Sequence, residues 1–309
     1  MKKLFMSALV VAALGSAASA QMDSDPAKIR LEVSRVAGSV SMITGVGGFA
    51  GGNVGVSVGE DGVFVIDDEI KPMTPKLKAA VATLSKQPPR FLINTHWHGD
   101  HAGGNEGMAE SGAILVAHDN VRERMSAEHI VEFGGEQEKI PASPAKALPI
   151  LTFSQEVTFH LNGDVVHVFH VANAHTDGDA IVHFRKANVI HMGDTFVTMG
   201  YPFIDLSSGG SVEGFIKAAD RVLPLCNDST KIIPGHGPLA DRKKLTEWRQ
   251  MLVKIRDRVA AAIAKKQKLE QVKAAKPTAE FDAVWGQGFL KPDEMVEVVF
   301  RSLTTPKGK

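Results

Sequence analysis

The sequence contains a single cysteine, Cys226, among its 309 residues. An intramolecular disulfide is therefore impossible, and no cysteine lies near residue 20, where a bacterial lipid anchor would need one. Because Cys226 follows the apolar stretch 222–225, we expect it to be a small buried hydrophobic side chain. The 44% hydrophobic content is enough for a substantial core without covalent cross-links.

The chain also lacks an excess of charge of either sign and any long apolar run. It has 35 basic and 35 acidic residues, so it has no nucleic-acid-binding footprint. Its longest apolar run, Leu4 to Leu14, is too short to span a bilayer comfortably. We therefore expect a mature chain with neither a nucleic-acid partner nor a membrane anchor.

The first twenty residues have the pattern of a secretory signal peptide. Lys2 and Lys3 precede the apolar run, and the small residues Ala18 and Ala20 fit a cleavage site. We predict cleavage after Ala20 and a periplasmic or secreted mature chain of residues 21–309. Without the two lysines, that chain has 33 basic against 35 acidic residues, a formal charge of about −2.

Glycine-bounded apolar runs predict strands in two blocks, each followed by helices. The predicted strands are 39–45, 53–59, 62–68 and 90–96, then 157–161, 164–171, 180–184, 188–192 and one at the start of 231–237. The predicted helices are 74–86, 211–223 and 240–266, with 267–309 as a C-terminal helical extension docked on the domain. Two such halves predict one pseudo-symmetric α/β domain with stacked sheets inside and helices outside.

Histidines are concentrated in "NTHWHGDH", residues 94–101, directly after a predicted strand. His96 and His98 can point to the same side and hold one ion, while Asp100 and His101 are displaced toward a neighbouring position. Zinc takes about four nitrogen, oxygen or sulfur ligands, so one short loop cannot complete two such shells. Three further candidates each follow a predicted strand and have a glycine nearby: His175, Asp194 and His236.

These motifs resemble those of the metallo-β-lactamase superfamily. "THWHGDH" matches its HxHxDH signature, and "AHTDGD", "GD" and "GHG" match its later motifs in order. The likeness covers roughly residues 35 to 265. It implies a four-layer αββα sandwich with metal ions at one edge of the two sheets.

The resemblance also implies the roles of the ligands. The first metal would be held by His96, His98 and His175, the second by Asp100, His101 and His236, with Asp194 bridging the two. The expected cofactors are two Zn²⁺ ions, with iron or manganese in one site as an open alternative. Ions about 3.5 to 4 Å apart make a shared water acidic enough to yield hydroxide near neutral pH. That bridging hydroxide would attack a carbonyl, and Asp100 would be the catalytic residue that orients it.

Two departures from the familiar zinc β-lactamases bear on the substrate, a small molecule. Asp194 stands where many of them have a cysteine, and Val197 where many have a lysine that holds the drug's carboxylate. With the export signal, this favours a hydrolase of cyclic amides or lactones with at least weak β-lactamase activity. The alternatives are a thioesterase of glyoxalase II type and a non-catalytic zinc-binding periplasmic protein. The sequence does not predict the oligomeric state.

Two segments are candidates for the mouth of the site. The glycine-rich stretch 44–53 predicts either a mobile flap, with Phe49 covering the substrate, or a plain hairpin turn. Tyr201 could line the pocket or merely pack. The remaining histidines are interpreted as packing or surface residues: His160, His167, His170 and His183 in strands, His118 and His129 in or beside a surface helix, and His191 behind the site.

Overall fold

The computed structural model describes residues 25–133 and 136–305. The predicted signal peptide therefore lies outside the described residues. Within them, no helix combines the length and the apolar character needed to cross a bilayer.

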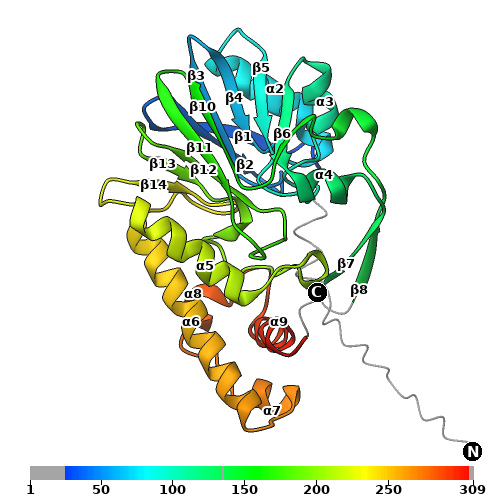
Figure 1. Cartoon of the computed structure of the whole chain (residues 1–309), viewed down its shortest axis with the longest axis vertical. Helices are drawn as coiled ribbons and strands as arrows, with labels where there is room; N and C mark the ends of the chain where they lie inside the picture. Colours follow the sequence, from blue (N-terminus) through cyan, green and yellow to red (C-terminus); the bar gives the residue numbers. More distant parts are fainter. Residues whose placement is uncertain (1–24, 134–135, 306–309) are drawn as a thin grey trace, which may run out of the picture.

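A seven-stranded sheet forms the N-terminal half, in the order β1-β2-β3-β4-β5-β6-β9. Its first four strands form an antiparallel meander, and β4, β5, β6 and β9 run parallel. The strands are β1 (Arg30–Ala37), β2 (Val40–Val46), β3 (Val54–Gly59), β4 (Gly62–Ile66), β5 (Pro89–Ile93), β6 (Ile114–His118) and β9 (Leu151–Phe153). Helices α2 (Thr74–Leu84) and α3 (Asn105–Glu110) cover its outer face (Figure 1).

A five-stranded sheet forms the second half, in the order β10-β11-β12-β13-β14. Its strands are β10 (Glu156–Leu161), β11 (Asp164–His170), β12 (Ala180–Phe184), β13 (Val189–His191) and β14 (Lys231–Ile233). Helices α5 (Val212–Val222) and α6 (Arg242–Ala264) cover its outer face. Only the last pair, β13 and β14, is parallel within this sheet.

Three layers of apolar side chains hold the four layers of structure together. Between the sheets, Phe64 of β4 meets Phe184 of β12 edge to face, with ring centroids 6.2 Å apart. Leu77 of α2 is buried against the first sheet. Trp248 of α6 packs on Phe215 of α5 over the second sheet. The arrangement is the predicted αββα sandwich, because each sheet has one face toward the other sheet and one toward helices.

Smaller elements surround this core. Helix α4 (Asp119–Met125) leads into a separate two-stranded hairpin, β7 (His129–Phe133) and β8 (Glu136–Ile140). After α6 come α7 (Leu269–Ala274), α8 (Asp282–Trp285) and α9 (Pro292–Thr304), which lie below the sandwich in Figure 1. Short 3-10 turns are η1 (Lys71–Met73), η2 (Ala145–Ala147), η3 (Gly193–Thr195), η4 (Leu206–Ser208) and η5 (Leu223–Leu225).

The structure confirms each predicted strand and helix, with ends shifted by a few residues, and adds elements that were not predicted. The additional ones are β1, β6, β9, α3, α4 and the β7–β8 hairpin. The prediction that His118 lies beside a helix is confirmed, because this buried last residue of β6 is also the N-cap of α4. The placement of His129 was wrong, because His129 begins β7. The four histidines predicted in strands lie in β10, β11 and β12.

Candidate metal centre

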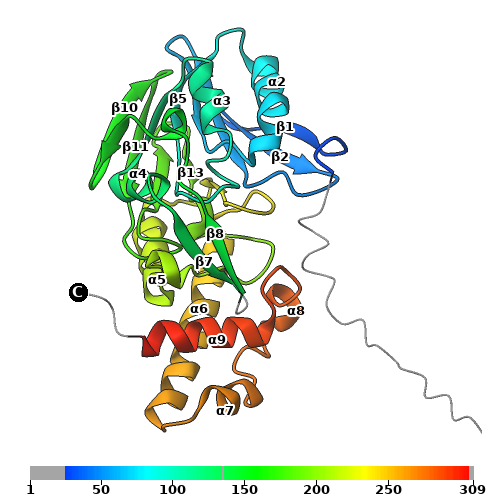
Figure 2. The same cartoon turned by 90° about the vertical axis from the view of Figure 1, so that its right-hand side faces the viewer.

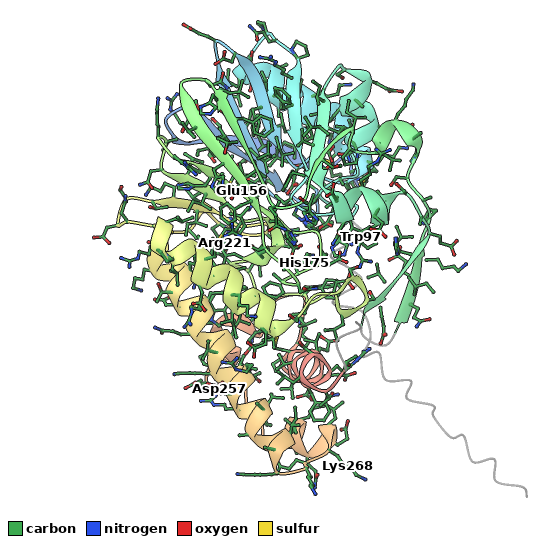
Figure 3. All side chains as sticks on the ribbon, viewed as in Figure 1. Trp97, Glu156, His175, Arg221, Asp257 and Lys268 are labelled. Atoms are coloured by element: carbon green, nitrogen blue, oxygen red, sulfur yellow. The ribbon has the colours of Figure 1, made fainter. Side chains whose placement is uncertain are left out.

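The predicted ligands converge at one edge of the two sheets, beyond the ends of four strands. His96, His98, Asp100 and His101 follow β5, and His175 follows β11. Asp194 and His236 follow β13 and β14, which are parallel neighbours. Figure 3 labels Trp97 and His175 close to this edge, where the sheets face α5 and α9. The convergence follows from the topology, because these strands end on the same side of the sandwich.

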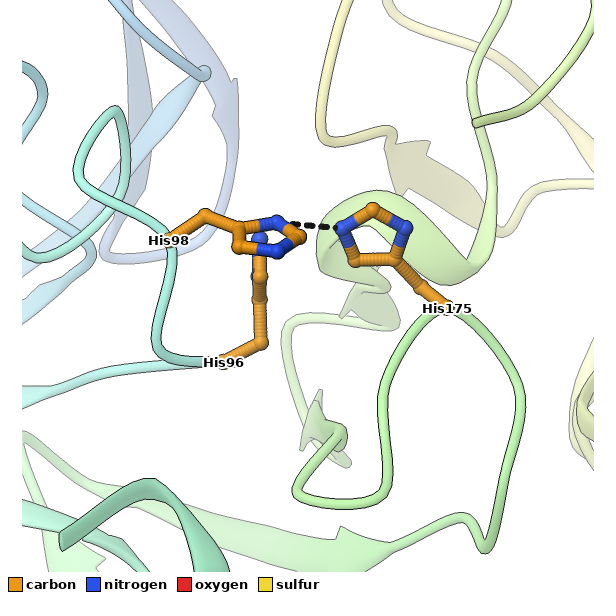
Figure 4. Close-up of side chains that lie close together, drawn as sticks. All are labelled: His96, His98 and His175. Carbon is orange, nitrogen blue, oxygen red and sulfur yellow. Dashed lines mark hydrogen bonds between the residues drawn. The ribbon is translucent and has the colours of Figure 1, made fainter. Parts of the chain in front are cut away.

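His96, His98 and His175 form the first group. Their rings point toward one another, as Figure 4 shows, and one nitrogen from each lies within 4.8 Å of the others. Nδ1 of His98 is 2.8 Å from Nε2 of His175. The sequence prediction that these three side chains come together is therefore met by the geometry.

Asp100, His101 and His236 form the second group. Nε2 of His101 is 3.2 Å from Nε2 of His236. Oδ2 of Asp100 lies 3.2 Å from the same nitrogen of His236 and 3.6 Å from Nε2 of His101. The two groups adjoin, since His96 also lies within ligand distance of Asp100 and His101.

The Asp194 carboxylate lies between the two groups. Its Oδ1 atom is 3.1 Å from Nε2 of His101, and its Oδ2 atom is 3.4 Å from Nε2 of His236. The same Oδ2 atom is 3.8 Å from Nε2 of His175, in the first group. One carboxylate thus faces ligand atoms of both groups, which is the arrangement expected of a bridge.

Hydrogen bonds fix the orientation of the imidazoles in the first group. Nε2–H of His98 donates to Asp205 at 2.9 Å, and Nδ1–H of His175 donates to the carbonyl of Phe203 at 2.8 Å. The ring nitrogen left without a proton therefore points into the group in each case. Such outer partners fix the tautomer and raise the basicity of a ligating imidazole.

Asp67 plays the same part in the second group. Its Oδ2 atom accepts a hydrogen bond from Nδ1–H of His101 at 2.8 Å, and its carboxylate also accepts from the backbone and hydroxyl of Thr95. Asp67 has a φ of 61°, in the left-handed region that is unfavourable for a residue with a Cβ. This strained backbone conformation directs the Asp67 carboxylate toward His101 of the second group.

Sequence reasoning missed three buried carboxylates that support the ligands: Asp67, Asp179 and Asp205. Asp179 accepts hydrogen bonds from the backbone N–H groups of His175 and Thr176, so it holds the loop that carries His175. For two of the three, their position in the sequence was a usable signal: Asp67 directly follows the apolar run of a predicted strand, and Asp179 is the last residue of the "AHTDGD" motif. Asp205 lies in a loop with no periodic pattern, and nothing in the sequence pointed to it.

The pKa shifts differ between the two groups in a way that suits cations. Burial lowers the pKa of His96 well below 6.5 and that of His175 to about 4, so both rings are neutral. In the second group, burial opposes protonation, but the carboxylate of Asp194 and its neighbours raise the pKa of His236 to about 9. In the metal-free chain, the protons on His101 and His236 offset the negative charge of the neighbouring carboxylates. A bound divalent cation would offset that charge in their place.

Two buried atoms test whether metal ions fit. Nε2 of His96 is buried without a hydrogen-bond partner among the described residues, and the buried Oδ1 of Asp194 makes no well-aligned hydrogen bond there, although it lies 3.1 Å from Nε2 of His101. An unsatisfied buried polar atom costs free energy, and both of these atoms face the ligand groups. The residues fit two divalent cations, one in each group, and imidazole with carboxylate is a donor set that zinc accepts.

Glycines allow this close packing. A Cβ added at Gly52 would lie 2.0 Å from Cε1 of His101, and one at Gly235 would lie 1.9 Å from Oδ1 of Asp194. Neither position has room for a side chain. The glycines that flank the motifs are thus part of the site, because they let two loops approach the ligand side chains.

The glycine-rich segment between β2 and β3 is attached to the centre at its C-terminal part. The N–H of Gly52 donates to the carbonyl of Asp100, and the side-chain amide of Asn53 donates to the carbonyls of Pro234 and Gly237. The ring of Phe49 stacks on that of His236, with centroids 5.9 Å apart. Phe49 therefore lies beside the second group, while the choice between a mobile flap and a plain hairpin turn stays a prediction.

Tyr201 packs against the C-terminal segment. Its side chain is buried, and its hydroxyl donates to the carboxylate of Asp282 at 2.8 Å. Of the two interpretations of Tyr201, the structure supports packing, because the hydroxyl is directed at α8.

Two further side chains lie where the sequence predicts them. Cys226 is buried. His191 lies behind the centre, and its Nε2–H donates a hydrogen bond to the carbonyl of Asn53.

The family comparison agrees with these motifs. The family model for the metallo-beta-lactamase superfamily matches residues 47–262, more than half of the chain. Two curated relatives are hydroxyacylglutathione hydrolases. The one from Erythrobacter litoralis (strain HTCC2594) is 29% identical over 110 residues, which is 35% of each protein. The one from Pelagibacter ubique (strain HTCC1062) is 26% identical over 112 residues, 36% of this chain and 38% of the relative. This chain thus aligns with only about a third of either relative.

Solved structures share the fold at low sequence identity. A metallo-beta-lactamase from Pontibacter korlensis is 20% identical with a TM-score of 0.58, covering 72% of this chain and 99% of the other. The sec-alkylsulfatase Pisa1 from Pseudomonas sp. is 15% identical with a TM-score of 0.65, covering 90% of this chain and 51% of the other. The chain therefore spans about half of the sulfatase, and the likeness extends to the fold alone.

Proposed function

Because the chain belongs to the metallo-beta-lactamase superfamily, we propose that it is a hydrolase that works with two divalent metal ions, most simply zinc. The observation that carries this proposal is the position of Asp194. Its carboxylate faces His175 of the first group and His101 and His236 of the second. A carboxylate in that position lowers the repulsion between two neighbouring dications.

Two bound ions supply Lewis acidity and lower the pKa of a coordinated water toward neutrality. The chain's own residues hold and orient the reactants. His96, His98 and His175 would hold one ion with neutral imidazoles, and His101 and His236 the other. In the metal-free chain, burial raises the pKa of Asp100, but the positive charge on His101 and His236 outweighs this and keeps the carboxyl ionised. Bound cations would supply that positive charge instead, so the Asp100 carboxylate could accept a hydrogen bond from the attacking water and orient it.

We propose a cyclic amide or lactone as the substrate class, with at least weak β-lactamase activity. Val197, which stands where many zinc β-lactamases have a lysine, is almost fully buried. The stacked ring of Phe49 gives the mouth an apolar side next to His236. A small ring with an apolar substituent suits this surface better than a polyanionic substrate does.

A thioesterase of glyoxalase II type is the second candidate. The observation that favours it is the match to two hydroxyacylglutathione hydrolases over 110 and 112 residues. The predicted export signal argues against it, since glutathione thioesters are chiefly intracellular. A zinc-binding protein without catalytic activity remains the non-enzymatic alternative.

A substrate panel on the purified mature chain separates these candidates. A chromogenic cephalosporin, several lactones, a glutathione thioester and a secondary alkyl sulfate are compared with zinc present and with zinc chelated. We expect zinc-dependent turnover that is fastest on a lactone or on the cephalosporin. Turnover of the thioester alone would replace the first candidate with the second, and no turnover of any substrate would favour the non-catalytic alternative.

The localisation is proposed on the sequence pattern of residues 1–20 alone. A mature chain outside the inner membrane meets lactams and lactones from the environment.

A further inference from the structure

The family match ends at residue 262, but the segment beyond it contacts loops that border the metal centre. One contact is at the loop before η4, where the N–H of Tyr201 donates to the carbonyl of Trp285. That loop also carries Phe203, whose carbonyl orients His175. The second contact is at the β7–β8 hairpin.

The β7–β8 hairpin lies beside the first group of ligands. The ring of Trp97 lies between those of His98, 5.0 Å away, and His129 of β7, 5.5 Å away. Val131 of β7 packs with the same cluster as Trp97. The indole N–H of Trp97 donates to Ser208 of η4, whose hydroxyl donates to Asp205, the partner of His98. The hairpin therefore borders the centre on the His98 side.

Helix α9 holds the opposite face of this hairpin. Residues two apart on a strand share a face, so Ile130 and Glu132 point away from the face that carries Val131. Arg301 of α9 pairs with Glu132 in a two-pronged geometry, with distances of 2.6 Å and 3.0 Å between guanidinium nitrogens and carboxylate oxygens. Figure 2 shows the hairpin directed from the sandwich toward α9. The hairpin is thus held between Trp97 and Arg301.

Helix α9 is itself fixed to the sandwich. Met295, Val296 and Val299 are buried in the cluster that covers the second sheet. The hydroxyl of Ser302, next to Arg301, accepts a hydrogen bond from the N–H of Val212 at the start of α5. Most ion pairs near the surface add little to stability, but a bidentate pair whose arginine is held on a fixed helix can add a measurable amount.

We propose that Arg301 is a positioning residue, which holds the β7–β8 hairpin through Glu132 as the wall of the substrate site next to His98. This inference rests on the proposed hydrolase function. It assigns the C-terminal helix, which lies outside the family match, a part in substrate binding. The proposal does not require any change at the metal ligands. A variant of Arg301 that keeps its full metal content therefore shows that the metal centre itself is undamaged.

The experiment uses the full mature chain loaded with zinc. Arg301→Met removes the charge, and Arg301→Lys retains the charge but not the two-pronged geometry. A double variant, Glu132→Arg with Arg301→Glu, restores the pair in reverse. The matched control is Lys273→Met, which breaks the 2.6 Å pair with Glu297 elsewhere on α9. Amide hydrogen exchange over residues 129–140, bound metal, kcat and KM are measured for each variant.

We expect Arg301→Met to speed exchange in the hairpin and to raise KM about two- to fivefold, with kcat and metal content nearly unchanged. Arg301→Lys should lie between it and the wild type, the double variant should recover both values, and Lys273→Met should match the wild type. Unchanged exchange and KM in Arg301→Met would overturn the proposal, as would an equal effect of Lys273→Met. If the wild type hydrolyses nothing, the proposed function fails, while the exchange rates still decide whether Arg301 holds the hairpin.

Discussion

The Oδ2 atom of Asp67 lies 2.8 Å from Nδ1 of His101, and both side chains are completely buried. The contact fixes the tautomer that leaves Nε2 of His101 directed at Asp194 and His236. It comes from two neighbouring parallel strands, because Asp67 follows β4 and His101 follows β5. The fold thereby supplies a ligand together with the acid that orients it.

Replacing Asp67 should weaken the second metal site. We expect Asp67→Asn to lower the zinc affinity of that site about 10- to 100-fold, because the amide lacks the charge that supports the His101 imidazole. The first site should keep its zinc. Competition with a chromogenic chelator measures both affinities, and Asp220→Asn, which removes an exposed pair with Arg249, serves as the control. Equal affinities in Asp67→Asn and the control would show that Asp67 does not support the ligand.

Asp194→Ala should release chiefly the second metal. His96, His98 and His175 would still offer three imidazoles, enough for one zinc ion with water in the fourth position. The variant should fold, bind about one ion per chain and lose most of its activity. Elemental analysis set beside hydrolysis rates measures this. A variant that keeps two tightly bound ions and near-normal turnover would show that Asp194 is not a bridge.

His183, which lies in β12 and is not one of the candidate metal ligands, should make stability depend on pH. Burial lowers its pKa from 6.5 to about 4. Between these values the unfolded chain binds a proton that the folded chain does not, so the free energy of unfolding rises with pH in this window. The contribution of His183 is complete above pH 6.5 and falls by up to about 3 kcal/mol as the pH drops toward its folded pKa.

His183→Gln should therefore lose less stability on acidification than the wild type does. Urea unfolding of both metal-free proteins at pH 4.5 and 7.5, about the ends of this window, measures the difference. The matched control is His160→Gln, at an exposed position of β10, which is separated from β12 by β11 in the same sheet. A gap between His183→Gln and the wild type that is the same at both values would contradict the assignment.

The N-terminus offers a test that does not depend on the fold. Expressed with its full sequence in a bacterial host, the chain should reach the periplasm and begin near Gln21, because Ala18 and Ala20 fit the signal-peptidase cleft. Mass spectrometry of the periplasmic protein reads the terminus directly. An intact Met1 on that protein would refute cleavage.

The convergence of the candidate ligands could be predicted from sequence because each of them belongs to a short motif at a strand end. His96, His98 and His101 lie in one segment of six residues, and Asp194 and His236 each stand beside a glycine that the packing requires. The strands β3 and β4 were also predictable, since both are apolar runs bounded by glycine. The local sequence pattern was sufficient to predict an element or a ligand where one buried strand face or one short loop determines its structure.

The elements and supporting residues that the sequence analysis did not predict depend mostly on contacts between residues that are distant in sequence. Strand β1 is largely exposed, so its residues carry no clear alternation. The β7–β8 hairpin relies on Trp97 and on Arg301, which is 169 residues from its partner Glu132. Asp205 supports His98 from 107 residues away. No local pattern encodes such pairs, and only the folded chain shows them.

A zinc titration of the metal-free mature chain tests the central claim most directly. Bound zinc per chain and hydrolysis of the best substrate in the panel are followed together as zinc is added. The account predicts that binding stops at two ions per chain and that most activity appears as the second ion binds, because Asp194 and both histidine groups then act as one centre. Full activity with the zinc chelated away, or saturation at one ion in the fully active protein, would contradict it.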